Sequence, residues 1–239
     1  MGRAFEYRKA RKMKRWASMA KTFTKVGREI AIAIKEGGGD PEYNPRLRMA
    51  IQNAKAANMP KANVDAAIKR AESKDAEDYD EVIFEGYAPH GVALIVECTT
   101  NNNNRTVANI RHIFSKYGGS LGVSGSVDFM FTRKGEFKVL RESIPGEVED
   151  LELELIDAGL DEMKMDEDEI IFYTAFEDFG SFSKALDERN IEIAGAELVR
   201  IPSHYKELSD EEVEDVINLV DKMEEDDDVA NIFHNMDME

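Results

Sequence analysis

The fold is decided by residues 86–131, GYAPHGVALIVECTTNNNNRTVANIRHIFSKYGGSLGVSGSVDFMF. The strand-like run DEVIFEGYA enters this stretch, turns at Pro89-His90-Gly91 and returns as the apolar run GVALIVECTT, which predicts a hairpin. Asn104 can cap a helix over RTVANIRHIFSKYG, which two glycines then end. The segment SGSVDFMF alternates and predicts a further strand with Val127, Phe129 and Phe131 on one face. The predicted order is therefore β-β-α-β.

A second pattern follows this unit. Residues 134–202 read as strand, helix, two strands, helix and strand, the order of a ferredoxin-like fold. The chain closes with an amphipathic helix and the apolar run VANIFHNM, residues 229–236, which resembles a strand able to complete the first β-β-α-β unit. We therefore predict an α+β protein whose middle α/β domain, residues 77–133 plus 203–239, is interrupted by an inserted α/β domain, residues 134–202.

Residues 1–76 are predicted to form an all-helical domain. Apolar residues recur at helical spacing in MAKTFTKVGREIAIAIKEGGG, and its three glycines end the helix. Asn44 followed by Pro45 gives an N-cap and a first-turn proline for the next helix, and Met59-Pro60 ends it. The last two helices can also be read as a helix-turn-helix, although any helical hairpin with a proline break has this pattern.

The charge distribution is strongly asymmetric. The formal net charge is −18, yet residues 1–74 hold 18 Lys and Arg against 7 Asp and Glu, while the remainder holds 13 against 42. The run RKARKMKRW, Arg8 to Trp16, places six cations in nine residues. Such asymmetry points to polyanion binding by the basic part. The alternatives are docking onto the protein's own acidic residues, a solvated helix face, or an anionic membrane surface.

We expect the basic side chains to contact nucleic-acid phosphates, which requires no base-specific geometry. The candidates lie along the predicted helical domain: Arg3, Arg8, Lys9, Arg11, Lys12, Lys14, Arg15, Lys21, Lys25, Arg28, Arg46, Arg48, Lys55 and Lys61.

Several chemistries are not expected. The four histidines lie in unrelated segments without metal-ligand spacing, so no metal site is predicted. The glycine-rich run GGSLGVSGS precedes a strand, whereas phosphate-binding loops lead into a helix, so no nucleotide cofactor is expected. No small-molecule substrate or catalytic set stands out. The single cysteine, Cys98, suits a reducing cytoplasm, and no apolar run approaches the roughly 20 residues that span a bilayer.

Residues 86–131, together with FTKVGREI, NPRLRMAIQNAKAANMPKANVDAAIKRA and VANIFHNM, closely resemble the YebC/PmpR family, which includes a mitochondrial translational activator. The chain departs from many members at its start, MGRAFEYRKARKMKRW. The resemblance implies three domains, one of them inserted, and no cofactor or catalytic residue. It also makes the loop Asn102, Asn103, Asn104 and Arg105 a candidate partner-contact edge, although turn and cap chemistry alone explains asparagine there.

Members of this family are described either as DNA-binding transcriptional regulators or as ribosome-associated translation factors. The resemblance therefore implies a non-catalytic regulator of gene expression that binds DNA or RNA. A third reading of the charge pattern is a protein-binding adaptor whose acidic surface recognises a basic protein. The sequence leaves the oligomeric state open.

Overall fold

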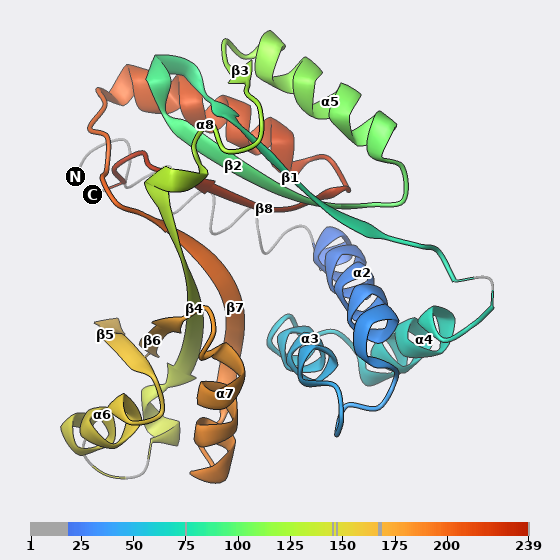
Figure 1. The fold of residues 1–239 in the computed structure, drawn as a ribbon, viewed down its shortest axis with the longest axis vertical. Helices are drawn as coiled ribbons and strands as arrows, with labels where there is room; N and C mark the ends of the chain where they lie inside the picture. Colours follow the sequence, from blue (N-terminus) through green and yellow to red (C-terminus); the bar gives the residue numbers. More distant parts are fainter. Residues whose placement is uncertain (1–18, 75, 145, 147, 167–168, 239) are drawn as a thin grey trace.

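The computed structural model describes residues 19–74, 76–144, 146, 148–166 and 169–238. Within these residues the chain forms a helical group followed by two four-stranded sheets with their own helices, an α+β arrangement (Figure 1).

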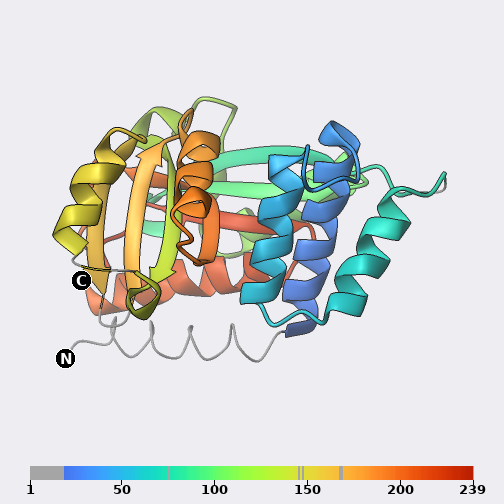
Figure 2. The ribbon, with the colours of Figure 1, turned by 90° about the horizontal axis from the view of Figure 1, so that it is seen from below.

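The helical group consists of α2 (Met19–Gly37), α3 (Pro45–Ala56) and α4 (Lys61–Ala71). Its core contains Val26, Ile30 and Ile34 of α2, packed against Leu47 of α3 and Val64 of α4. Each fully buried side chain of this size contributes roughly 1.5–3 kcal/mol, so the three helices hold together mainly through this seam. Figure 2 shows α3, α2 and α4 side by side.

Asn44 caps α3 as the sequence predicts. Its Oδ1 accepts the N–H of Leu47 at 3.0 Å, and its Nδ2 donates to the carbonyls of Ala33 and Gly38 at 2.6 and 2.8 Å. The buried side chain therefore starts one helix and satisfies two carbonyls near the end of the preceding one.

The first sheet has the strand order β3-β1-β2-β8. Its strands are β1 (Asp80–Tyr87), β2 (Ala93–Thr100), β3 (Ser120–Leu121) and β8 (Val229–His234). The predicted hairpin is confirmed, because β1 and β2 pair antiparallel, and so is the closing strand, because β8 pairs with β2. The helices α5 (Asn103–Lys116) and α8 (Asp210–Glu224) pack on one face, and α2–α4 lie on the other side of the sheet (Figure 1).

The strand predicted over residues 124–131 is wrong. Residues 122–130 form a loop and a short 3₁₀ turn, and β4 begins only at Phe131. The cause is the buried carboxylate of Glu85, which accepts the main-chain N–H groups of Gly125, Val127 and Asp128 at 2.6, 2.8 and 2.9 Å. Because these three N–H groups bond Glu85, they cannot form hydrogen bonds with a neighbouring strand. As a result Val127 is buried, whereas Phe129 is 76% exposed.

The cap predicted for α5 is also corrected. Asn102, not Asn104, is the N-cap, and its Oδ1 accepts the N–H of Arg105 at 3.1 Å. Four consecutive asparagines offer equivalent capping side chains, and the end of β2 decides which one stands at the helix start.

The second sheet has the order β5-β6-β4-β7, all antiparallel, as in a ferredoxin-like fold. Its strands are β4 (Phe131–Leu140), β5 (Leu160–Asp166), β6 (Glu169–Ala175) and β7 (Ile193–Pro202), and its helices are α6 (Val148–Ile156) and α7 (Phe179–Glu188). The strand β4 runs unbroken through position 134, where the sequence places a domain boundary.

The three groups touch one another. Met49 of α3 joins the core formed by the second sheet, α6 and α7. Asn53 of α3 donates to the carbonyl of Ala196 at 2.8 Å and accepts its N–H at 3.1 Å. Arg200 of β7, 4% exposed, bonds Glu97 of β2 at 2.9 Å and Asp128 at 2.7 Å. Because Arg200 is buried, the loss of these carboxylates would leave its charge desolvated and unpaired, so the contacts fix how the two sheets meet.

Candidate nucleic-acid interface

Part of the predicted basic surface is turned toward the protein itself. Along α2, Lys21 donates to the carbonyl of Glu225 at 2.8 Å and Lys25 to that of Ala230 at 3.3 Å. Arg28 donates to the carbonyls of Thr99 at 2.9 Å and Asp227 at 2.6 Å. Three of the predicted phosphate contacts therefore attach α2 to the turn between α8 and β8, to β8 itself and to the end of β2.

Asp228 is the centre of this fastening. Its carboxylate is 3% exposed and lies 2.9 Å from Arg28 and 2.7 Å from Arg105. It also accepts hydrogen bonds from the hydroxyls of Thr100 at 3.2 Å and Thr106 at 2.8 Å. Burial alone would raise the pKa of Asp228, but the hydrogen bonds from Arg105 and Thr106 and the charges of Arg105 and Arg28 lower it. Asp228 is thus held ionised as the anionic partner of two arginines.

Sequence reasoning missed this residue. Asp228 ends the acidic run EEDDD, which has no calcium-loop spacing, and none of its three consecutive aspartates is locally distinguishable from the others. Only the approach of α2 and α5 selects one of them.

The four residues of the candidate partner-contact loop have different roles. Asn102 caps α5, and Arg105 bonds Asp228 as well as the Oδ1 of Asn101 at 3.2 Å. Asn103 and Asn104 are exposed. Two of the four residues therefore have structural roles, and the other two face solvent.

Arg46, at the start of α3, is paired within the chain. Its guanidinium bonds Glu36 at 2.8 Å and Glu81 at 2.5 Å. This ion pair links the helical group to β1. Arg46 is therefore a weaker candidate for phosphate binding than its sequence position predicts.

The basic residues further along the helical group are arranged differently. They are exposed, and none of them forms an ion pair with another described residue. We call these residues the α3–α4 basic set: Arg48, Lys55, Lys61, Lys69 and Arg70. The first two, seven residues apart, lie on one face of α3, about 10 Å apart along its axis. The helix α3 contains no acidic residue. These cations remain available to an external anion.

The candidates Arg3, Arg8, Lys9, Arg11, Lys12, Lys14 and Arg15 lie outside the described residues. The candidates within the described residues are Lys21, Lys25, Arg28, Arg46, Arg48, Lys55 and Lys61. Of these, the structure brings the first three together at the acidic turn and the start of β8 and leaves the last three exposed.

Comparison with protein families decides the relationship. A family model described as the TACO1/YebC protein N-terminal domain matches residues 3–74, and one described as the TACO1/YebC second and third domain matches residues 79–236. The chain belongs to the TACO1/YebC family. The resemblance drawn from residues 86–131 is thereby confirmed.

The similarity to relatives in the TACO1/YebC family covers almost the whole chain. A protein of Flavobacterium johnsoniae is 54% identical over 236 residues, covering 99% of both chains. One of Porphyromonas gingivalis is 55% identical and covers 99% of this chain and 97% of its own. Both are named "Probable transcriptional regulatory protein". The crystal structure of the conserved hypothetical protein Aq1575 from Aquifex aeolicus matches with a TM-score of 0.79 at 39% identity, over 91% of this chain and 90% of that one.

Two further observations concern only the described residues. Among the helices that the structure describes, none has the length and apolar character needed to cross a membrane. Within the same residues, no group of three or more His, Cys, Asp or Glu side chains is placed to hold a metal ion.

Proposed function

We propose that this chain is a non-catalytic regulator of gene expression that binds nucleic acid through its basic helical domain. The observation that carries the proposal is the contrast within that domain. The cations of α2 are bonded to the chain's own carbonyls and to Asp228, whereas the α3–α4 basic set is exposed and unpaired among the described residues. The exposed cations of α3, a helix that contains no acidic residue, repel one another, and phosphates relieve that repulsion.

The charge of the α/β domains also supports binding of nucleic acid at the helical domain. Residues 75–239 hold 13 Lys and Arg against 42 Asp and Glu, so most of the α/β surface repels a phosphate backbone. The nucleic acid would then be confined to the helical domain. The six cations of Arg8 to Trp16 would add contacts at its start.

The proposal is tested by the salt dependence of binding. Each phosphate neutralised on duplex DNA steepens the slope of log K against log salt by about 0.9. We expect the full chain to bind a labelled 25-base-pair duplex with a slope steeper than about −4 between 50 and 200 mM KCl. A variant with Arg48→Gln, Lys55→Gln, Lys61→Gln and Lys69→Gln should bind more weakly, with a slope about 3 to 4 units shallower.

A matched control replaces four exposed lysines of the α/β domains: Lys116→Gln, Lys164→Gln, Lys184→Gln and Lys222→Gln. It removes the same number of charges and should leave the slope unchanged. Equal weakening by both variants would show that net charge, and not the helical domain, governs binding.

The relatives' names favour DNA as the target, while the acidic α/β domains favour a target that also presents basic protein, such as a ribosome. The second candidate is therefore an RNA-binding translation factor that uses the same cations. Sedimentation of the chain with ribosomes at low salt, abolished by the α3–α4 variant, would support it. Binding to the duplex without any sedimentation would favour the transcriptional role.

A further inference from the structure

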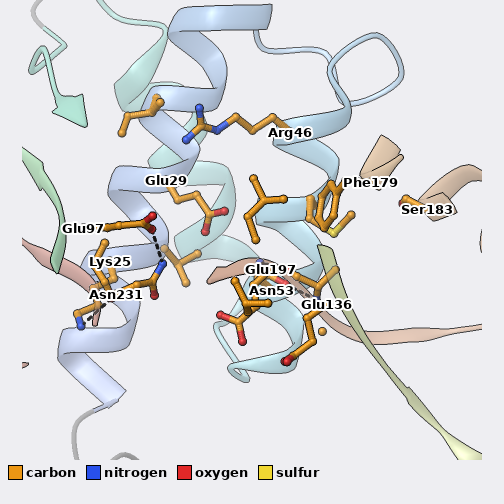
Figure 3. Close-up of a pocket in the computed structure, with 18 of the residues that line it drawn as sticks. Lys25, Glu29, Arg46, Asn53, Glu97, Glu136, Phe179, Ser183, Glu197 and Asn231 are labelled. Atoms are coloured by element: carbon orange, nitrogen blue, oxygen red, sulfur yellow. Dashed lines mark hydrogen bonds between the residues drawn. The ribbon is translucent and has the colours of Figure 1, made fainter. Parts of the chain in front are cut away.

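A cleft of about 1030 Å³ lies where the three groups of elements meet. Its walls are α2 and α3 on one side, β4, β7 and α7 on another, and β1, β2 and β8 on the third (Figure 3). Apolar side chains line much of it: Val26, Ile32, Met49, Ile83, Phe179 and Leu198. Of these, Ile83 is 48% exposed and Leu198 38% exposed, so two large apolar groups face solvent inside the cleft.

One wall of the cleft is an open strand edge. The strand β7 stands at the end of the second sheet, with β4 on one side only. The side-chain amide of Asn53 bonds both the N–H and the C=O of Ala196, as a neighbouring strand would. These groups of Ala196 therefore point away from β4.

The main-chain groups of Leu198, two residues after Ala196, point in the same direction. The β4–β7 register is regular from Gly195 to Pro202, and main-chain groups of alternate residues point to opposite sides of a strand. The N–H and C=O of Leu198 thus also point away from β4, and no described residue pairs with them. Pro202, which has no N–H, falls at an outward position of the same series.

Charges of both signs line the cleft, Arg48 and Arg133 among them, and one anion inside it, Glu29, has no ion-pair partner among the described residues. Arg46 is paired with Glu36 and Glu81, Lys138 with Glu136 and Glu197, and Arg200 with Glu97 and Asp128. Glu29 points from α2 into the cleft, opposite Phe179, and none of the described cations lies within ion-pair distance of it (Figure 3). Burial raises the pKa of Glu29, opposed by the charge of Arg46 and assisted by Glu197 and Glu81. A cation entering the cleft would relieve this cost.

We propose that this cleft binds an extended, Lys- or Arg-bearing peptide segment of a partner protein, which pairs with β7 at Leu198 and places a cationic side chain against Glu29. Strand addition supplies main-chain hydrogen bonds at an open edge, and alternate side chains reach the apolar lining. At Glu29 a nucleic-acid strand fits less well than a cationic peptide, because the unpaired carboxylate would face its phosphates. The inference does not rest on the nucleic-acid role of the α3–α4 basic set, of which Arg48 alone lines the cleft.

The test uses a fluorescein-labelled pentapeptide, Thr-Arg-Val-Arg-Thr amide, and anisotropy with the full chain. Leu198→Pro removes the outward N–H while leaving the β4 ladder intact, and Leu198→Ala keeps that N–H as its control. Glu29→Gln removes the anion without changing shape, and Glu211→Gln, on the exposed side of α8, removes a charge elsewhere. We expect Leu198→Pro and Glu29→Gln each to weaken binding about tenfold. Leu198→Ala should weaken it less than Leu198→Pro, and Glu211→Gln should leave it unchanged.

Three results would overturn the proposal. They are no anisotropy change with the wild-type chain up to about 1 mM, equal binding by wild type and Glu29→Gln, or equal binding of the Thr-Glu-Val-Glu-Thr peptide. If Leu198→Pro loses its native circular dichroism spectrum, Glu29→Gln alone decides. Duplex binding by Glu29→Gln should match wild type, which separates this proposal from that on nucleic acid.

Discussion

Arg28 and Asp228, 200 residues apart in the chain, meet at 2.9 Å with side chains 15% and 3% exposed. Their contact joins the first described helix to the turn before the last strand. A cation that the sequence assigns to nucleic acid is thereby part of the protein's own framework.

Replacing Asp228 by Asn should destabilise the fold by about 3 kcal/mol, because Arg28 and Arg105 lose the anion between them. Urea unfolding followed by circular dichroism measures the change. Asp227→Asn is the control, since Asp227 contributes only its main-chain carbonyl to Arg28, and it should change stability by less than about 0.5 kcal/mol. Equal effects at the two positions would contradict the role of Asp228.

The Asp228 contribution should depend on pH. Its pKa is lowered on folding, so its stabilisation is complete above the unfolded pKa near 3.9 and is lost as the pH falls through the folded value. The stability difference between wild type and Asp228→Asn should be constant from about pH 5 to pH 8 and shrink below about pH 4. A difference that grows on acidification would be the wrong sign.

Glu85→Ala should release the loop of residues 122–130. The substitution leaves the N–H groups of Gly125, Val127 and Asp128 without their acceptor, at a total cost of about 3 kcal/mol or more. Amide hydrogen exchange at these three positions should become faster, while the relative exchange rates of the amides within α8 should stay the same. Glu85→Gln retains one acceptor oxygen and should lie between wild type and Glu85→Ala.

Asn53→Ala should free the edge of β7 at Ala196. The amide of Ala196 then loses the Oδ1 acceptor at 3.1 Å, and its hydrogen exchange should accelerate at least tenfold. Lys55→Ala, an exposed change on the same helix, should leave it unaltered. Unchanged exchange in Asn53→Ala would mean that this strand-like pairing is not maintained in solution.

Lys21 and Lys55 should differ in nucleic-acid binding although their charges are equal. Lys21 donates to the carbonyl of Glu225, while Lys55 is exposed on α3. Lys55→Gln should therefore lower duplex affinity severalfold at 100 mM KCl, and Lys21→Gln should lower it less. Fluorescence anisotropy with the same duplex compares them. A larger loss for Lys21→Gln would indicate that α2 leaves the acidic turn to bind.

Most of the secondary structure could be predicted from local signals. The apolar spacing in α2, the Asn44 cap, the hairpin and the ferredoxin-like order were all read from residues close in sequence. The failure at residues 124–131 had a non-local cause, because the Glu85 carboxylate that captures this loop lies 40 residues earlier. Val127, Phe129 and Phe131 do alternate in the sequence, but main-chain N–H groups in this segment bond Glu85 and are not available for strand pairing.

The candidate site could be predicted only in part. Sequence by itself determined the family, the order of the elements and the charge asymmetry, because periodicity, caps and composition are properties of neighbouring residues. Tertiary structure alone decided which cations are free. Whether a lysine or arginine meets an anion depends on residues as far away as Asp228 is from Arg28, and the free energy of such a pair is set by the burial that folding creates.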